Sequence, residues 1–508
     1  MIKAPLFVDK IRTYGVSRPD DVALIAPDGR LTWGQLIARC EALAARLREE
    51  GCKPGDRIVV IGRNSIAFLE VMLGALFARC ATVPISPSLA VETMARLLED
   101  ARPAIAFIDA DKLPAAGLAT TPIRTVLLDG DYRAWLAAGM AKPDPQPVAD
   151  DDLFSIIYSS GTTGVPKGIA HGNRARSDFI DARPQVADPA SRLAYVSTAL
   201  YTNLSFLGMI GPLYRGVAVM VPDRFTVDGF IGAVIEHGVT DTALVPIQLQ
   251  RIIDTPRFDK AAMKGLVSTL ASGSALGPDL RRRLAACWPG SLVDGYGSTE
   301  AGGIAYLDIT AHPDKLDTVG KVAPGSEFYI VDDRDSIAPT GQAGEIVNYS
   351  SVVMQGYFGR EDLTREGRWR HPDGRLFVRT GDMGRVDAEG WLYVTGRKKD
   401  MIISGGLNIF AIDIEDVLDA HPQVQESAVI AIPSERWGES PYAVVVLHPG
   451  AALDPAELLA WANERLAKAA RLAGLELRDA LPRSADMEKV LKRELRAPFW
   501  AGRTVDVA

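Results

Sequence analysis

Residues 158–168 read Tyr-Ser-Ser-Gly-Thr-Thr-Gly-Val-Pro-Lys-Gly, and the function of the chain is best approached from this stretch. Glycines and small hydroxyl residues leave backbone N–H groups exposed, and such groups can hold a polyphosphate. Lys167 can add a positive charge. The stretch is not a Walker loop, because Gly168 follows Lys167 where a Walker loop has Ser or Thr. By itself a glycine-rich turn indicates phosphate binding only weakly.

The composition around this stretch is that of a globular protein. The 508 residues correspond to roughly two to four domains or subdomains. Hydrophobic residues make up 47% of the chain and charged residues 24%, which argues against disorder and against a coiled coil. With 56 Lys and Arg against 64 Asp and Glu, the formal charge is −8, so we expect no long-range attraction to nucleic acid.

Cysteine usage and the apolar segments predict a reduced, cytoplasmic protein with no transmembrane segment. The four cysteines form no CxxC pair, so we expect neither a disulfide framework nor a zinc site. The N-terminus lacks the apolar segment of a signal peptide. Residues 193–214 carry no formal charge and are about as long as a membrane span. Their Ser, Thr, Asn, Gly and Pro residues favour buried strands and loops beside a pocket instead.

The spacing of apolar residues predicts an α/β fold. Before residue 150, and again between 192 and 294, short apolar runs alternate with helical patterns, which predicts βαβ units and mostly parallel sheets. From about 317 to 395, short β-like segments between Gly and Asp turns predict an antiparallel or barrel-like subdomain. A smaller α+β unit follows. The expected helices are 36–49, 68–78, 229–237, 409–420 and 455–472, and the expected strands include 56–62, 217–222, 242–246, 426–433 and 442–448.

Other motifs accompany the glycine-rich stretch in a fixed order. They are Leu31-Thr-Trp-Gly-Gln-Leu36, Asp294-Gly-Tyr-Gly-Ser-Thr-Glu300, Gly344-Glu345 with Gly356-Tyr357, Arg379-Thr-Gly-Asp382, Gly396-Arg-Lys-Lys-Asp400 with Gly405-Gly406, and Lys489-Val-Leu-Lys-Arg-Glu-Leu495. Together they resemble the motifs of the adenylate-forming superfamily of acyl-CoA synthetases, peptide-synthetase adenylation domains and luciferases. The resemblance covers nearly the whole chain and indicates the acid–CoA ligase branch.

The resemblance implies an enzyme that uses ATP, Mg²⁺ and coenzyme A. A carboxylate would attack the α-phosphorus of ATP to give an acyl-adenylate and pyrophosphate, and the CoA thiol would then take the acyl group and release AMP. It also implies a large N-terminal domain (1–396) of two βαβ-type subdomains and a small β-barrel-like one, which binds ATP and the acid. A smaller, mobile α+β C-terminal domain (397–508) would carry the catalytic lysine.

The functional residues of the family carry over position by position. Catalytic roles fall to Lys489, Thr299, Glu300 and Lys167. The nucleotide would be bound by Ser159, Ser160, Gly161, Thr162, Thr163, Gly164, Ser272, Gly273, Ser274, Asp294, Gly295, Tyr296, Gly297, Ser298, Asp382 and Arg397. Glu300 and Thr162 would hold Mg²⁺, Lys399 would be the hinge, and Gly405, Gly406 and Trp437 would contact CoA. The acyl pocket would include Tyr201, Thr202, Asn203, Phe206, Val245 and Ile304.

Individual roles follow from the same resemblance. Tyr296 would stack on adenine, Thr299 would reach the α-phosphate, and Asp382 would accept hydrogen bonds from the ribose hydroxyls. Lys489 would bridge the α-phosphate and the carboxylate of the acid. His171, which follows the glycine-rich stretch, is interpreted as structural.

The chain departs from the family pattern at three places. Thr202 stands where histidine is usual, which predicts an unusual acyl pocket. Glu488 replaces the glycine before Lys489. The segment after Phe410 lacks a common proline and has Asp413 in place of glutamate.

The substrate is bounded but not identified. The pocket candidates are mostly small or apolar, with no Asp for an amino-acid ammonium and no basic residue evident for a second carboxylate. We therefore expect an aromatic, alicyclic or medium- to long-chain aliphatic monocarboxylic acid. Two alternatives stay open: an acyl-AMP ligase that loads a separate carrier protein, and a degenerate nucleotide-binding protein without turnover. The oligomeric state, monomer or homodimer, is not predicted.

Overall fold

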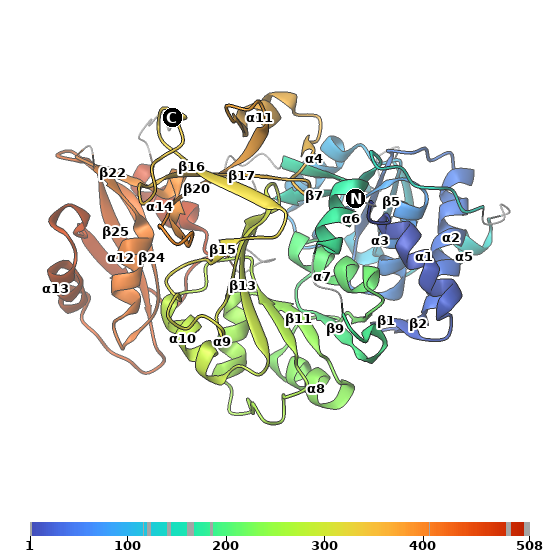
Figure 1. Cartoon of the computed structure of the whole chain (residues 1–508), viewed down its shortest axis with the longest axis horizontal. Coiled ribbons are helices and arrows are strands. Elements are labelled where there is room, and N and C mark those ends of the chain that lie inside the picture. Colours follow the sequence, from blue (N-terminus) through green and yellow to red (C-terminus); the bar gives the residue numbers. More distant parts are fainter. Residues whose placement is uncertain are drawn as a thin grey trace.

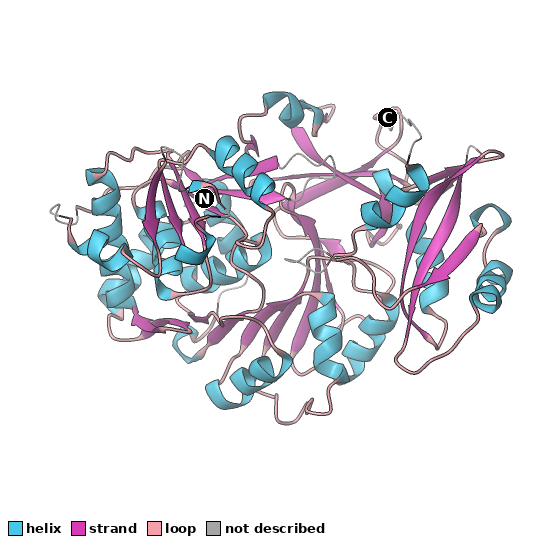
Figure 2. Cartoon of the chain, turned by 180° about the vertical axis from the view of Figure 1, so that it is seen from behind, coloured by secondary structure: helices cyan, strands magenta, loops and turns pink. Residues whose placement is uncertain are grey.

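The computed structural model describes residues 3–114, 116–118, 123–139, 144–159, 167–182, 186–405, 407–483 and 489–501. Four β-sheets organise these residues, and the helices lie against the sheet faces (Figures 1 and 2). Two large sheets fill the N-terminal half, an antiparallel sheet follows, and a separate sheet forms the C-terminal part. The predicted α/β class is confirmed.

The first large sheet has seven strands and carries the glycine-rich stretch between two of them. Its strands are, in spatial order, β18 (Gly356–Tyr357), β8 (Lys167–Gly172), β7 (Leu153–Ser159), β4 (Ala81–Pro84), β3 (Arg57–Ile61), β5 (Ile105–Ile108) and β6 (Arg124–Leu127). From β7 to β6 neighbouring strands are parallel, while β8 and β18 are antiparallel additions.

Alternate residues of β3 bury against different helices, which explains its uninterrupted apolar run. Ile58 and Val60 join the core formed with α2 (Trp33–Glu49) and α3 (Ile66–Phe77), whereas Val59 and Ile61 join the core formed with α4 (Val91–Ala101). Both faces of the parallel sheet are therefore covered, as βαβ units require.

The second large sheet has nine strands and shares a core with the first. Its strands are, in spatial order, β15 (Lys321–Val322), β14 (Gly302–Asp308), β13 (Ser291–Ser298), β12 (Ser268–Ala271), β11 (Asp241–Leu244), β9 (Leu193–Val196), β10 (Ala218–Met220), β1 (Val22–Ala26) and β2 (Gly29–Thr32). Ala194 and Val196 of β9 pack into the same core as α3, while Tyr195 faces the core of α8 (Val227–His237) and α9 (Pro246–Asp254).

The remaining helices of this half connect the strands. They are α1 (Phe7–Ser17), α5 (Tyr132–Ala137), α6 (Asn173–Asp181), α7 (Asn203–Tyr214), α10 (Pro278–Cys287) and α11 (Glu361–Glu366), with 3₁₀ turns η1 (Ala110–Lys112) and η3 (Pro189–Ser191).

The antiparallel subdomain lies where the sequence predicts it. Its strands are β16 (Ser326–Val331), β17 (Gly344–Ser350), β20 (Leu376–Val386) and β19 (Arg368–Arg370), with β21 (Leu392–Arg397) pairing with β20. The long β20–β21 hairpin brings Asp382 opposite Arg397.

The C-terminal part is a five-stranded sheet between helices. Its strands are β23 (Leu407–Ile409), β22 (Ile402–Ser404), β25 (Gly438–Leu447), β24 (Val424–Ser434) and β26 (Gly474–Leu477), and its helices are α12 (Ala411–Asp419), α13 (Pro455–Arg465) and α14 (Lys492–Trp500), with 3₁₀ turns η4 (Lys398–Asp400) and η5 (Lys468–Ala470). Residues 398–401 connect the two sheets, so the predicted division at 396/397 falls just before this connection and stays a prediction.

Two expectations about secondary structure are wrong. The helix expected over 455–472 ends at Arg465, and Lys468–Ala470 form a separate 3₁₀ turn. Residues 193–214 form β9 and then the twelve-residue helix α7, rather than strands and loops. The Thr202 hydroxyl accepts a hydrogen bond from the Ser205 N–H and caps the helix. The prediction of strands and loops rests on the uncharged composition of this segment and does not consider Thr202 as an N-cap. No helix in the described ranges is both long and apolar enough to cross a membrane.

Candidate active site

The glycine-rich stretch connects two strands that lie side by side. Ser159 ends β7 and Lys167 begins β8, and these two residues are partners across the antiparallel pair. Ser160 to Gly164, which we predict to bind phosphate, lie outside the described residues together with Val165 and Pro166. The Lys167 ammonium lies 5.2 Å from the centre of the Tyr357 ring, within cation–π range.

Tyr357 connects two predicted catalytic groups. Its ring faces Lys167, and its hydroxyl lies 3.4 Å from Oε1 of Glu300, the predicted Mg²⁺ ligand. Burial and the neighbouring Glu300 charge raise the pKa of the Tyr357 phenol, so it stays protonated and can donate to the carboxylate. The sequence places Tyr357 in a motif but assigns it no role, because nothing in the spacing shows that β18 lies beside β8.

The Asp382 carboxylate is a second centre of the site. The Tyr296 hydroxyl donates to Oδ2 at 2.7 Å, and Arg397 Nε lies 2.7 Å from Oδ1. Burial raises the pKa of Asp382, while the Arg397 charge acts in the opposite direction. Predicted nucleotide-binding residues from β13, β20 and β21 are thus brought together.

Lys489 approaches the same carboxylate from the C-terminal part. Its positive charge is among the influences that lower the pKa of Asp382. Lys399 is near as well: burial lowers the pKa of its ammonium, and both Asp382 and Arg493 of α14 act on it. The predicted catalytic lysine and hinge lysine therefore lie close enough to the predicted ribose-binding carboxylate for their charges to interact with it.

Several predicted nucleotide-binding residues are held in place by contacts with the surrounding protein. Asp294 is buried against the Arg281 guanidinium, whose Nε lies 3.0 Å from Oδ2, and the Ser272 hydroxyl donates to the Gly295 carbonyl at 2.9 Å. A Cβ atom at Gly297 would meet the Gly302 carbonyl oxygen at 2.1 Å, so only glycine fits there. The remaining predicted positions here, Gly273, Ser274 and Ser298, lie on or between β12 and β13.

The predicted acyl-pocket residues fall into two groups. Tyr201, Thr202, Asn203 and Phe206 gather at the N-terminus of α7. Val245 occupies the N-cap position of α9, and Ile304 of β14 packs with Ala301 and with Ile346 of the antiparallel subdomain, in a different core from Phe206. Phe206, Val245 and Ile304 are fully or almost fully buried, so in this structure they serve as core residues.

A buried polar chain joins the two halves of the site. His171 Nε2 lies 2.8 Å from the Thr299 carbonyl oxygen, and Arg176 NH2 lies 3.1 Å from His171 Nδ1. The same Arg176 nitrogen donates to Asn203 Oδ1 at 2.8 Å. The sequence does not predict a role for Arg176, because arginine is rarely buried and nothing in its spacing from Lys167 indicates a function.

The predicted CoA contacts also lie together. The Gly405 N–H donates to the Trp437 carbonyl at 2.8 Å, and a Cβ atom at Gly405 would meet the Trp437 ring at 2.9 Å. Gly405 has φ +58°, which also favours glycine. Trp437 is 48% exposed and carries the Arg436 guanidinium over its ring. Gly406 lies outside the described residues.

Comparison with known proteins identifies the family. The AMP-binding enzyme model matches residues 12–358, and that of the AMP-binding enzyme C-terminal domain matches residues 413–486. Feruloyl-CoA synthase of an Amycolatopsis species is 33% identical over 478 residues, covering 92% of this chain and 94% of the relative. The fatty acid–[acyl-carrier-protein] ligase ScoC of Streptomyces coeruleorubidus is 29% identical, covering 95% and 94%.

The solved structures agree with this result. ATP-bound MatB from Rhodopseudomonas palustris superposes with a TM-score of 0.85 at 25% identity, covering 96% of this chain and 98% of MatB. The predicted fold and superfamily are both confirmed. The chain belongs to the AMP-binding enzyme family and stands among its AMP-forming acyl-CoA synthetases.

Proposed function

We propose that the protein is an ATP-dependent acid–CoA ligase that forms an acyl-adenylate and then an acyl-CoA. The observation that carries this proposal is the convergence of Tyr296, Arg397 and Lys489 on the Asp382 carboxylate. A carboxylate paired with donors from separate elements can bind the ribose hydroxyls, and a lysine beside it can reach the α-phosphate.

The proposed first step joins two anions, so its rate depends on preorganised positive charge. An oxygen of the substrate carboxylate attacks the α-phosphorus, the bond to the bridging oxygen breaks, and pyrophosphate leaves. Lys167 would stabilise the charge on the leaving pyrophosphate, and Lys489 would hold the α-phosphate and the attacking carboxylate together. Tyr357 supports the first role by holding the Lys167 ammonium over its ring.

Glu300 is suited to hold Mg²⁺ together with the phosphates, since this hard cation prefers carboxylate and phosphate oxygens. The bound ion would neutralise charge on the phosphates. Thr162, the other predicted ligand, lies outside the described residues. The Tyr357 hydroxyl lies 3.4 Å from Glu300 Oε1, a distance that allows only a weak hydrogen bond to the carboxylate.

In the proposed second step, the CoA sulfur attacks the carbonyl carbon and AMP leaves with the bonding electrons. The names of relatives that act on feruloyl and indoleacetyl groups support an arylalkyl or arylpropenoic acid as substrate, and a fatty-acid ligase among them keeps aliphatic acids in range. The carrier-protein ligase at 29% identity favours a second candidate, transfer of the acyl group to the phosphopantetheine thiol of a separate carrier protein.

The test is pyrophosphate release with Mg²⁺-ATP and a panel of acids, each with and without CoA. The panel runs from acetate through fatty acids to benzoates, arylpropenoates and cyclohexanecarboxylate. Multiple turnovers that require CoA for one class of acid would support the ligase. A single burst unchanged by CoA, with turnover restored by a phosphopantetheinylated carrier protein, would favour the second candidate. ATP binding without any release would contradict both.

A further inference from the structure

Arg176 is an unusual buried cation. Its side chain projects from α6 and is only 4% exposed, and burial lowers the pKa of its guanidinium to about 9. Among the described residues no carboxylate pairs with it, and its Nε has no hydrogen-bond partner. A buried charge without a counter-ion costs free energy, so packing alone does not account for an arginine at this position.

The partners of Arg176 are all neutral and come from different elements. NH2 donates to Asn203 Oδ1 at 2.8 Å and to His171 Nδ1 at 3.1 Å, and it lies 3.5 Å from the Ser155 hydroxyl. Ser155 is on β7 and His171 on β8, the two strands that flank the glycine-rich stretch. Asn203 is the first residue of α7.

Arginine can only donate hydrogen bonds, and this property fixes the orientation of its neighbours. His171 must turn a bare Nδ1 toward Arg176, so the ring hydrogen sits on Nε2, which donates to the Thr299 carbonyl at 2.8 Å. Burial and the Arg176 charge lower the pKa of His171, which keeps the ring neutral. Asn203 must likewise turn its amide oxygen, not its NH₂, toward Arg176.

We propose that Arg176 is the positioning residue that joins the nucleotide and acid halves of the adenylation site. Through His171 it holds the backbone at Thr299, the predicted α-phosphate contact, and through Asn203 it holds the first turn of α7, the predicted acyl helix. This inference rests on the proposed function. Misplacement of reacting groups by about 1 Å can lower the rate about 100-fold, so a rigid link between the two halves should increase the rate of adenylation.

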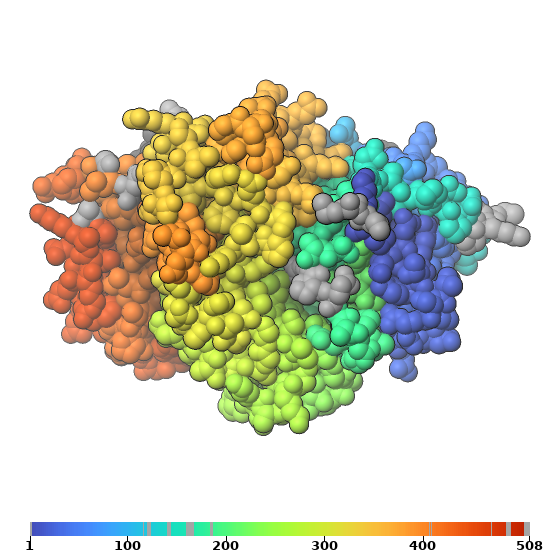
Figure 3. All heavy atoms as spheres, in the orientation of Figure 1, coloured from blue at the N-terminus to red at the C-terminus, as the bar shows by residue number. Residues whose placement is uncertain are grey.

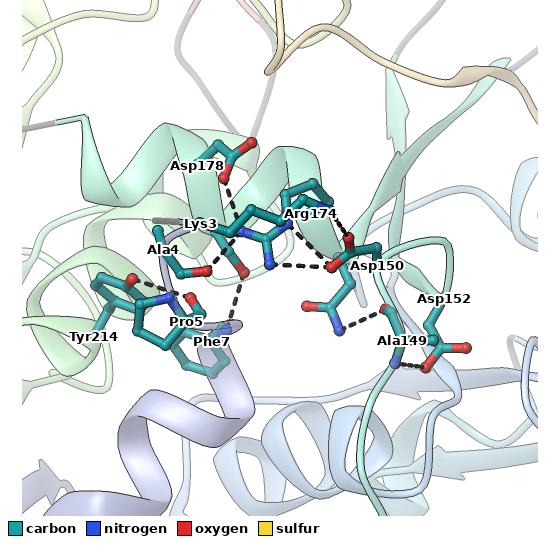
Figure 4. Close-up of polar contacts among 12 residues, drawn as sticks. Lys3, Ala4, Pro5, Phe7, Ala149, Asp150, Asp152, Arg174, Asp178 and Tyr214 are labelled. Atoms are coloured by element: carbon teal, nitrogen blue, oxygen red, sulfur yellow. Dashed lines mark hydrogen bonds and ion pairs between the residues drawn. The ribbon is translucent and has the colours of Figure 1, made fainter. Parts of the chain in front are cut away.

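A matched control lies two residues away on the same helix. Arg174 contacts Asp150 at 3.0 Å, Asp178 at 3.0 Å and the Ala4 carbonyl at 2.7 Å, so it ties α6 to the N-terminal segment rather than to the site (Figure 4). Arg174→Met and Arg176→Met each remove one guanidinium from α6. Only Arg176→Met breaks the link between Thr299 and α7.

The kinetic experiment measures acid-dependent exchange of pyrophosphate into ATP. We expect Arg176→Met to lower kcat about 100-fold and to raise KM for the acid. The kcat of Arg176→Lys should lie between those of the wild type and Arg176→Met, because one ammonium cannot hold both partners in the same geometry. Arg174→Met should stay within about threefold of the wild type at equal fraction folded. Asn203→Ala should raise the acid KM in the wild-type background and add nothing in Arg176→Met. Equal kinetics for the two Met variants would overturn the proposal.

A spectroscopic experiment tests the proposal without any substrate. In protein labelled with ¹⁵N-histidine, the His171 signals, assigned by their loss in His171→Gln, should show the neutral Nε2–H form down to about pH 5.5, well below the ordinary histidine pKa. In Arg176→Met the ring should change tautomer or protonate within this range. An unchanged His171 spectrum would overturn the proposal. Since this readout needs no turnover, failure of the proposed function leaves it decisive.

Discussion

At the scale of single residues, the Asp382 carboxylate is the point at which three distant segments meet. Tyr296 and Arg397 occupy its two oxygens, and Lys489 lies close enough to influence its pKa. Asp382 and Arg397 pair because an irregularity between Met383 and Gly384 shifts the register of the β20–β21 hairpin by one residue, a detail that hairpin symmetry in the sequence does not reveal. The approach of Lys489 is predicted by the family resemblance alone, since residue spacing does not show how the C-terminal part packs.

Removing the Lys489 ammonium tests its proposed role in the first half-reaction. We expect Lys489→Ala to lower the adenylation rate about 100-fold or more, because one charged contact that acts mainly in the transition state is lost. Thioesterification of a supplied acyl-adenylate should persist. Pyrophosphate exchange and thioester formation from the synthetic adenylate measure the two steps. The control is Lys492→Ala, because the Lys492 ammonium pairs with Glu415 within the C-terminal part. If folded Lys489→Ala loses both steps equally, the proposed role of Lys489 is contradicted.

Burial of His171 predicts a pH dependence of stability. The folded protein keeps this ring neutral with a lowered pKa, whereas the unfolded chain takes up the proton below about pH 6.5. The unfolded state therefore binds more protons in that range, and stability falls as the pH is lowered through it. One such group contributes about 1.4 kcal/mol per pH unit.

Urea unfolding at pH 7.5 and pH 5.5 measures this contribution. His171→Gln should lose less stability than the wild type over the interval, by about 1.4 kcal/mol. His312→Gln, at an exposed histidine, serves as the control. Parallel pH dependences for the wild type and His171→Gln would show that the ring titrates normally in the folded protein.

At the scale of elements, periodicity predicts the buried sheets well and α7 poorly. The alternation of Ile58, Val59, Val60 and Ile61 between two cores is a local property of a strand buried on both faces. Helix α7 contains Gly208, Gly211 and Pro212 and is apolar on most sides, so its pattern resembles that of buried strands. Its helical state comes from the Thr202 cap and from packing against distant strands, which composition does not reveal.

The cap of α7 can be tested directly. We expect Thr202→Ala to lower the free energy of unfolding by about 1 kcal/mol, because the Ser205 N–H loses its acceptor. Thr202→Ser should be nearly neutral. The matched control is Thr226→Ala, which removes the equivalent cap of α8, where Thr226 accepts from the Gly229 N–H at 3.0 Å.

We expect Thr202→Ala and Thr226→Ala to lose similar free energy of unfolding but to differ in KM for the acid. If the start of α7 shapes the acyl pocket, Thr202→Ala should raise KM for the acid, whereas Thr226→Ala should leave that KM unchanged. Urea unfolding and steady-state kinetics on the same preparations provide both values. Identical kinetics for the two variants would remove this part of α7 from the pocket.

At the scale of the whole molecule, the C-terminal part lies against the antiparallel subdomain (Figure 3). Helix α12 contacts β21, and the Arg281 charge of α10 influences Asp416 of α12. This arrangement brings the Lys489 charge close enough to act on Asp382, as the proposed first half-reaction requires. The Gly405–Trp437 contact, predicted to meet CoA, belongs to the same C-terminal part. A ligase that uses both groups in turn must rotate this part between its steps.

The short connection at Lys398–Asp400 is the place where such a rotation can occur, because it joins the last strand of one sheet to the first strand of the next. We expect Lys399→Pro to slow thioesterification at least about tenfold more than adenylation, since proline fixes φ at one value and cannot follow the backbone change. Lys399→Ala, which keeps the backbone free, is the control for the lost ammonium. Adenylation is measured by pyrophosphate exchange and thioesterification by single-turnover transfer from preformed adenylate to CoA. If Lys399→Pro leaves the second step as fast as in Lys399→Ala, the rotation does not occur at this residue, and the hinge must be sought elsewhere in residues 396–401.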